Sequence, residues 1–228
     1  MTRVMLCGSR SAEDIQLLVD EGADAIGLIT EVKQELSCRL ALEEARNFCT
    51  LIPPMVSGVL ILTEERVEEI CRMVKYVCPD AVQLHGFNTP GDVAFLKREL
   101  KTRIIKTLHF QDGCFAGGGN PEDAALEFLK AGADAILLDT YGEGKYGSTG
   151  RTFDWDAARR IRDTVWPRPL ILAGGLHESN LSEAVGKVQP YAVDAFSSVT
   201  SDGKLSRAKV RDFIAAVKKT GVNVHDTR

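Results

Sequence analysis

The sequence predicts a (β/α)8 barrel, the TIM-barrel fold, formed as a single domain by residues 1–228. First, short apolar runs alternate with amphipathic segments along the whole chain, which is the pattern of βαβ units around a parallel sheet. Second, eight such pairs occur, the number that closes a barrel, although a doubly wound open sheet has the same local pattern. Third, no linker divides the 228 residues, and barrels commonly have roughly 200 to 250 residues.

Each expected strand is a short apolar run, and each is followed by a segment with helical periodicity. The expected strands are residues 4–7, 25–29, 56–62, 81–84, 104–108, 135–138, 170–173 and 191–195. The expected helices are residues 12–21, 42–51, 66–77, 91–100, 122–130, 155–165, 179–188 and 206–218.

Several element boundaries carry their own signals. Ser11 precedes two carboxylates and Asn120 precedes Pro121, as expected for side chains that satisfy the free amides of a first helical turn. Residues 21–26 and 131–136 are near-repeats in which a glycine ends a helix before the next strand. Glycine can turn the chain there in left-handed geometry, so we assign these repeats no chemistry. The glycine-rich residues 113–119 are a lid or a flexible connection, and we favour the connection.

Composition and charge narrow the classes of partner. A formal net charge of -4 argues against nucleic acid as the main partner. No apolar run approaches the roughly 20 residues that cross a bilayer, and no signal-peptide pattern opens the chain, so we expect a cytoplasmic protein with no membrane partner. The six cysteines contain no C-x-x-C pair and are expected to be reduced thiols. No zinc-ligand spacing occurs, so no metal site is expected.

Two side chains at the ends of expected strands could transfer protons. Cys7 ends the first apolar run, and Asp139 follows the sixth. In a barrel the carboxyl ends of the strands meet at one mouth, where catalytic residues lie. A thiolate base and a carboxylic acid on opposite sides of that mouth would form a proton-transfer pair.

Three late stretches could bind an anion. They are Tyr146-Gly147-Ser148-Thr149-Gly150, Ala173-Gly174-Gly175-Leu176 and Asp194-Ala195-Phe196-Ser197-Ser198. Glycines let backbone amides approach an anion, and hydroxyl groups add donors. Each stretch alone is explained as a turn. Because the loops after the seventh and eighth strands of a barrel commonly bind phosphate, the stretches together favour a phosphate site.

In order and spacing these motifs resemble the phosphoribosylanthranilate isomerase family of tryptophan biosynthesis, over nearly the whole chain. The matching segments are Leu6-Cys7-Gly8, Val82-Gln83-Leu84-His85-Gly86, Leu137-Leu138-Asp139-Thr140, residues 147–155, and Ala173-Gly174-Gly175-Leu176 with Asn180. The resemblance implies an isomerase that catalyses the Amadori rearrangement of N-(5-phosphoribosyl)anthranilate to 1-(2-carboxyphenylamino)-1-deoxyribulose 5-phosphate.

The resemblance also implies roles. Asp139 would be the general acid that opens the sugar, and Cys7 the general base that removes the C2 proton. We expect nearby cations or helix dipoles to lower the pKa of Cys7, and an apolar surround to raise the pKa of Asp139. The substrate's own imine accepts the electrons, so no cofactor is expected. The expected partner is a small phosphorylated molecule, and the chain is expected to be a monomer or a homodimer.

Further residues are expected to bind the substrate. Arg39 matches an arginine that holds the anthranilate carboxylate, for which its planar fork is suited, and the alternative is a solvated surface arginine. His85 lines the pocket or satisfies backbone groups in a loop. The other expected substrate-binding residues lie in the three late stretches: Gly150, Gly174, Gly175, Asp194, Ser197 and Ser198.

The chain departs from the family pattern at a few positions. Met5 stands where lysine is common, and Ser148 where a second glycine is usual. After the eighth strand, Phe196 replaces a serine, Ser198 a glycine and Thr200 a glutamate. Two alternatives therefore remain: a paralogous barrel isomerase for a different phosphorylated amino sugar, or a non-catalytic phosphate-ligand binding barrel. A bifunctional isomerase that also serves histidine biosynthesis would need an aspartate in place of Cys7. The joint presence of Cys7 and Asp139 favours an enzyme.

Overall fold

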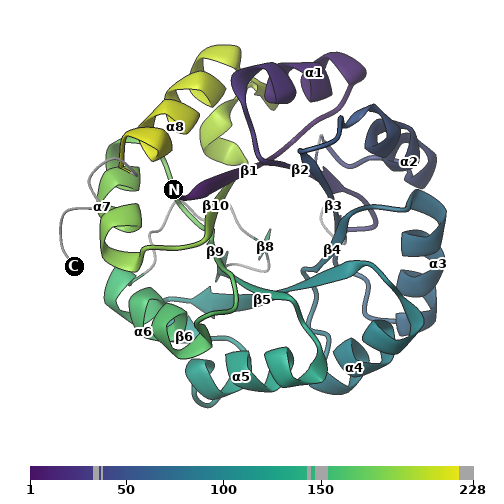
Figure 1. Cartoon of the computed structure of the whole chain (residues 1–228), viewed down its shortest axis with the longest axis vertical. Helices are drawn as coiled ribbons and strands as arrows, with labels where there is room; N and C mark the ends of the chain where they lie inside the picture. Colours follow the sequence, from purple (N-terminus) through teal and green to yellow (C-terminus); the bar gives the residue numbers. More distant parts are fainter. Residues whose placement is uncertain (33–35, 37, 143–144, 147–153, 221–228) are drawn as a thin grey trace.

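The computed structural model describes residues 1–32, 36, 38–142, 145–146 and 154–220, and it forms a closed ring of parallel strands surrounded by helices (Figure 1). The barrel strands are β1 (Arg3–Cys7), β2 (Ala25–Ile29), β3 (Ser57–Leu62), β4 (Ala81–Leu84), β5 (Arg103–Gln111), β7 (Ala135–Gly142), β9 (Leu170–Leu172) and β10 (Ala192–Ala195). The outer helices are α1 (Ala12–Glu21), α2 (Leu42–Leu51), α3 (Val67–Val77), α4 (Pro90–Glu99), α5 (Pro121–Ala131), α6 (Trp155–Val165), α7 (Glu178–Val188) and α8 (Arg207–Thr220).

Strand pairing closes the ring. Neighbouring strands follow the order β5-β4-β3-β2-β1-β10-β9-β7, and β5 also pairs with β7 in parallel. The predicted (β/α)8 barrel is therefore confirmed, and the open doubly wound sheet is excluded. Among the described residues, no helix is long and apolar enough to span a membrane.

Alternation along the strands creates two apolar layers. In β1, Val4 and Leu6 belong to the layer between strands and helices, whereas Met5 and Cys7 belong to the barrel interior. Successive side chains of a strand point to opposite faces, so every second residue of a barrel strand faces the interior. This alternation is what directs Cys7 inward at the end of β1.

The near-repeats at residues 21–26 and 131–136 connect a helix to the next barrel strand. Gly22 and Gly132 end α1 and α5 in left-handed geometry, with φ of 87° and 113°. The aspartate two residues later then accepts a backbone amide from a barrel strand: Asp24 from Val4 at 2.9 Å, and Asp134 from Ile104 at 2.8 Å. The interpretation of these glycines as helix ends is confirmed, and the aspartates explain why the whole motif recurs.

Short hairpins extend the carboxyl end of the barrel. The predicted fifth strand is longer than expected because β5 turns at Asp112-Gly113 into β6 (Cys114–Phe115). Both turn residues have positive φ, 49° and 81°, as a tight two-residue hairpin turn requires. Residues 113–115 are therefore part of a hairpin, and the connection favoured for residues 113–119 stays a prediction.

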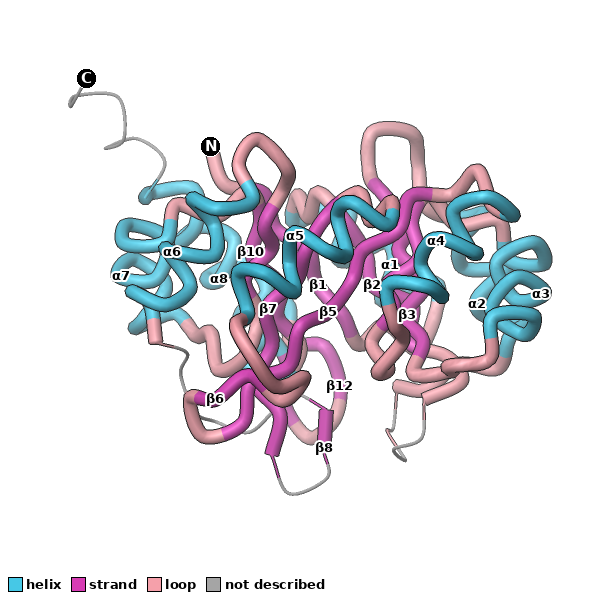
Figure 2. Tube along the Cα trace, turned by 90° about the horizontal axis from the view of Figure 1, so that it is seen from below, coloured by secondary structure: helices cyan, strands magenta, loops and turns pink. Residues whose placement is uncertain are grey.

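Other short elements lie at the same end. They are β8 (Lys145–Tyr146), the 3-10 helix η1 (Ser197–Val199), β11 (Thr200–Ser201) and β12 (Lys204–Leu205). Figure 2 shows β6, β8 and β12 below the same end of the barrel. The loops that follow the strands therefore surround one mouth.

Candidate active site

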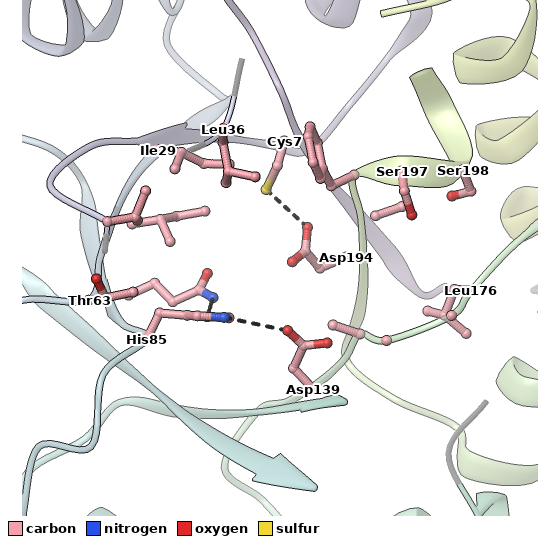
Figure 3. Close-up of a pocket in the computed structure, with 18 residues that line it drawn as sticks. Cys7, Ile29, Leu36, Thr63, His85, Asp139, Leu176, Asp194, Ser197 and Ser198 are labelled. Atoms are coloured by element: carbon pink, nitrogen blue, oxygen red, sulfur yellow. Dashed lines mark hydrogen bonds and ion pairs between the residues drawn. The ribbon is translucent and has the colours of Figure 1, made fainter. Parts of the chain in front are cut away.

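A pocket lies at the carboxyl ends of the barrel strands and brings most of the predicted site residues together (Figure 3). It holds about 750 Å³ of empty space that opens to solvent, within the range of small-molecule sites. The predicted residues that line it are Cys7, His85, Asp139, Gly174, Gly175, Asp194, Ser197 and Ser198. Gly150 lies outside the described residues.

Arg39 is the predicted residue that does not line this pocket. It is exposed in the segment after β2, and its guanidinium lies 3.7 Å from the Glu31 carboxylate. Both side chains are 46% exposed, so this pair is weak and the guanidinium is accessible to a ligand.

Cys7 faces a carboxylate. Its thiol donates a hydrogen bond to Asp194 Oδ1 at 3.2 Å, drawn as a dashed line in Figure 3. Gly27 on the neighbouring strand leaves the room that the thiol occupies, because a Cβ added at Gly27 would collide with Cys7 Sγ. Gly27 is the register partner of Cys7 on β2, so the absence of a side chain there makes room for the thiol.

The expected direction of the Cys7 pKa shift is wrong. Burial raises the pKa of the Cys7 thiol well above its usual value, and the charge and hydrogen bond of Asp194 raise it further. The charges of Cys38 and Asp139 act in the same direction. Because carboxylates rather than cations face the sulfur, Cys7 is a protonated thiol in the free protein.

Asp139 shows the expected shift. Burial raises its pKa from 3.8 to about 7, the Asp194 charge adds to the rise, and a hydrogen bond from the Thr140 amide to Oδ1 (2.8 Å) opposes it. Burial also raises the pKa of Asp194, to about 6, while the Cys7 thiol lowers it. At neutral pH the pocket therefore combines a carboxyl that is close to half protonated with a carboxylate that is mostly ionised.

His85 contacts the acid. Its Nε2 lies 3.5 Å from Asp139 Oδ2, and its Nδ1 lies 2.9 Å from Gln83 Nε2. Burial, His109 and Lys106 hold the pKa of His85 well below its usual value, so the ring is neutral. Since Gln83 Nε2 can only donate, Nδ1 accepts and the His85 proton is on Nε2, toward Asp139. His85 therefore lines the pocket, and its role in binding the substrate stays a prediction.

Side chains of β5 hold the backbone around His85. Lys106 Nζ donates to the carbonyl of Gly86 at 2.7 Å, and the His109 ring lies with Nε2 2.9 Å from the His85 carbonyl. Burial lowers the pKa of Lys106 to about 7 and that of His109 to about 4. The end of β4 is therefore fixed by its neighbouring strand, which holds His85 against Asp139.

The loops after β9 and β10, which are predicted to bind an anion, line the same pocket. Gly174 and Gly175 both have positive φ, 82° and 65°, and Asn180 Nδ2 donates to the Gly175 carbonyl at 2.9 Å. A Cβ at Gly174 would lie 2.8 Å from the Thr140 amide nitrogen, so only glycine fits. Opposite them, the Ser198 hydroxyl is buried and has no hydrogen-bond partner among the described residues.

Sequence reasoning did not identify several pocket residues. One wall is apolar and consists of Ile29, Val32, Leu36, Ile61 and Phe196. Alternation predicts that Ile29 and Ile61 face the barrel interior, but no polar signal marks them as a binding surface. The Phe196 ring packs against Gly8, whose φ is 108° and where an added Cβ would lie 2.9 Å from the ring. The departure at Phe196 is therefore accommodated by that glycine.

In the described part of the chain, one group of side chains could hold a metal ion. The ligand atoms of His85, His109 and Asp139 lie within 4.8 Å of one another. These residues already contact each other, since His85 faces Asp139 and His109 faces the His85 carbonyl. Their arrangement is explained without an ion, as support for the Asp139 carboxyl.

Comparison with known proteins gives a consistent assignment. The sequence profile described as N-(5'-phosphoribosyl)anthranilate (PRA) isomerase matches residues 4–216. N-(5'-phosphoribosyl)anthranilate isomerase of Methanothrix thermoacetophila is 35% identical over 218 residues, covering 96% of this chain and 99% of the relative. That of Halobacterium salinarum is 37% identical over 221 residues, covering 96% and 97%.

Solved structures of the same family align with this chain over nearly its whole length. The phosphoribosyl anthranilate isomerase of Thermotoga maritima aligns with a TM-score of 0.78 and 31% identity, over 96% of this chain and all of that one. A phosphoribosyl anthranilate isomerase in complex with reduced 1-(o-carboxyphenylamino)-1-deoxyribulose 5-phosphate aligns with a TM-score of 0.75 and 29% identity, with the same coverage. With its barrel, its pocket and these matches, the chain belongs to the N-(5'-phosphoribosyl)anthranilate isomerase family.

Proposed function

We propose that this chain catalyses the Amadori rearrangement of N-(5-phosphoribosyl)anthranilate to 1-(2-carboxyphenylamino)-1-deoxyribulose 5-phosphate in tryptophan biosynthesis. Asp139 is the general acid and Cys7 the general base. The observation that carries the proposal is the presence of both groups in the lining of one pocket, together with the Gly174–Gly175 and Ser197–Ser198 loops, in a chain of this family.

Asp139 begins the reaction by protonating the furanose ring oxygen. An acid at neutral pH must retain its proton, and burial supports this by raising the pKa of Asp139 to about 7. Protonation breaks the bond between the ring oxygen and C1, and the nitrogen lone pair forms the Schiff base. His85 and the Thr140 amide orient the two carboxyl oxygens, so the proton is presented from a fixed position.

Cys7 then removes the C2 proton. The thiol must first lose its own proton, and Asp194 Oδ1 at 3.2 Å is positioned to accept it. The open Schiff base carries a positive charge, which favours formation of the thiolate beside it. Removal of the C2 proton gives an enolamine and restores the thiol. The enolamine gains a proton at C1 and loses one from the C2 hydroxyl, which yields the ketone. The substrate's imine accepts the electron pair, so the chemistry requires no cofactor.

The remaining parts of the substrate match the remaining walls. The 5-phosphate is assigned to Gly150 and to the Gly174–Gly175 and Ser197–Ser198 loops, which line the pocket and supply glycine backbone and a buried hydroxyl without a partner among the described residues. The aromatic ring is assigned to the apolar wall that ends at Phe196. Arg39 is assigned to the anthranilate carboxylate, which requires its guanidinium to leave Glu31 and turn to the pocket mouth.

Of the alternatives, a paralogous isomerase for a different phosphorylated amino sugar shares the same acid and base. A binding barrel without catalysis has no use for a carboxyl held near neutral pKa beside a thiol. One structure of the Thermotoga maritima relative is described as derived from a dimeric enzyme. We propose a monomer or a homodimer for this chain.

The direct test is turnover of freshly generated N-(5-phosphoribosyl)anthranilate, followed by loss of its fluorescence. The wild type is expected to be active, and Cys7→Ser and Asp139→Asn are each expected to lose about a hundredfold or more, the contribution of a general base or acid. Cys71→Ser is the matched control, because Cys71 is also buried but lies on α3, outside the pocket lining. An inactive wild type that still binds inorganic phosphate would contradict the assigned substrate.

A further inference from the structure

Gln83 is a buried polar residue in the pocket wall to which the reaction above gives no role. It is 1% exposed, lies on β4 and lines the same pocket as Cys7 and Asp139. Its Nε2 has two hydrogen atoms, and it has two acceptors in reach: His85 Nδ1 at 2.9 Å and Thr107 Oγ1 at 3.3 Å. Its Oε1 is buried and has no hydrogen-bond partner among the described residues.

The hydrogen bonds of the Gln83 amide decide which ligand group it can bind. Both Nε2 hydrogens are used within the protein, so only Oε1 is left, and it can only accept a hydrogen bond. A buried acceptor without a partner is costly, and a ligand that donates to it removes that cost on binding. A matching ligand group must therefore be a donor, which the phosphate and carboxylate ends of the substrate are not.

The position of Gln83 selects one donor. In the parallel register Gln83 is the partner of Ile61, which belongs to the apolar wall. Two residues later His85 contacts the Asp139 carboxyl. Gln83 therefore lies between the wall assigned to the aromatic ring and the acid assigned to the sugar. The group that joins ring and sugar in an arylamino sugar is the bridging nitrogen with its hydrogen.

We propose that Gln83 Oε1 accepts a hydrogen bond from the bridging N–H of the arylamino sugar phosphate, and so makes the pocket select amine-linked over oxygen-linked sugars. This inference rests on the proposed function and adds the residue that recognises the nitrogen. The N–H is present in the substrate, in the Schiff base and in the product. It is positively charged only in the Schiff base, where the hydrogen bond is strongest. Gln83 thus stabilises the intermediate more than the ground state.

The test compares two competitive inhibitors of turnover: the reaction product, and its analogue in which an oxygen replaces the bridging NH. The wild type is expected to bind the NH compound about tenfold more tightly, the value of one buried hydrogen bond. Gln83→Met removes the acceptor at similar size, and the ratio is expected to fall to about one. Its kcat is expected to fall more than its KM rises. Gln83→Glu keeps an acceptor oxygen at this position and is expected to keep the preference for NH.

Gln16→Met is the matched control. It makes the same chemical change on the exposed face of α1, where Gln16 bonds only Asp20 among the described contacts, and it should leave the ratio unchanged. A role of Gln83 limited to holding His85 would lower kcat but leave the NH preference intact in Gln83→Met, which would overturn the proposal. A reversed preference in the wild type would also overturn it, because an N–H of Gln83 would then face the ligand. A wild type that turns over no phosphoribosylanthranilate would overturn the proposed function itself.

Discussion

Asp139 is expected to lower the free energy of unfolding near neutral pH, where it acts as the general acid. Burial raises its pKa from 3.8 to about 7. Between these pH values the folded state holds a proton that the unfolded state has lost, so the free energy of unfolding falls as the pH rises. Each pKa unit corresponds to 1.36 kcal/mol, so ionisation of Asp139 costs the folded state about 4 kcal/mol once the pH exceeds the folded pKa.

The substitution Asp139→Asn removes this cost. The asparagine oxygen can still accept the Thr140 amide, and the side chain cannot ionise. Relative to the wild type, the variant is expected to gain about 3 kcal/mol of unfolding free energy between pH 5 and pH 8, while it loses turnover. Urea denaturation of both proteins at the two pH values measures the difference.

The control is Asp163→Asn. Asp163 is a surface residue of α6 whose carboxylate pairs with Arg159 and Arg162. Desolvation raises its pKa, but the hydrogen bonds and charges of the two arginines together outweigh this and leave the pKa lowered. It is therefore ionised in both states over this pH range, and its variant should show the same stability difference at pH 5 and pH 8. If Asp139→Asn behaved like this control, Asp139 would be an ordinary ionised carboxylate and the argument for a general acid would fail.

Two further predictions concern the pocket. The pH profile of kcat/KM should be bell-shaped: activity rises as Asp194 ionises near pH 6 and can accept the thiol proton, and it falls as Asp139 loses its proton near pH 7. Asp194→Asn should remove the acid limb, and a profile flat from pH 5 to 8 would contradict both roles. Gly174→Ala should cost roughly 2 kcal/mol or more of stability and raise KM, because φ is 82° and the new Cβ meets the Thr140 amide. Gly186→Ala, inside a helix with open space around it, should be neutral or stabilising by about 0.5–1 kcal/mol in the same denaturation assay.

Much of the fold could be predicted because its signals are local. Apolar runs, helical periodicity and caps each occupy a few residues, and Ser11 and Asn120 do cap α1 and α5 as expected. The hairpin at Asp112-Gly113 also had a local signal, an Asp-Gly pair at the end of a strand. The glycine-rich residues that follow favour a loop and outweigh this signal.

The sequence predicts where the site residues lie, but only in part their protonation states and hydrogen bonds. Cys7 lies at the end of β1 as predicted, whereas Asp139 lies within β7, which continues past the expected end to Gly142; both side chains line the pocket. The state of the thiol depends on Asp194, which is 187 residues away in the chain, and no local pattern indicates that the two side chains form a hydrogen bond. Gln83 belongs to a matching segment of the sequence, but no local pattern indicates a role for it, because its free acceptor becomes evident only when the partners on β4 and β5 are placed.

The most direct test of the central claim is the single-turnover rate with substrate that carries hydrogen or deuterium at C2. Single turnover separates the chemical step from product release. We expect deuterium to slow the wild type severalfold, and Cys7→Ser to be slower than the wild type by about a hundredfold or more with either substrate. A Cys7→Ser protein with the wild-type rate, or a wild type with no isotope effect and no loss in that variant, would show that Cys7 does not remove the C2 proton.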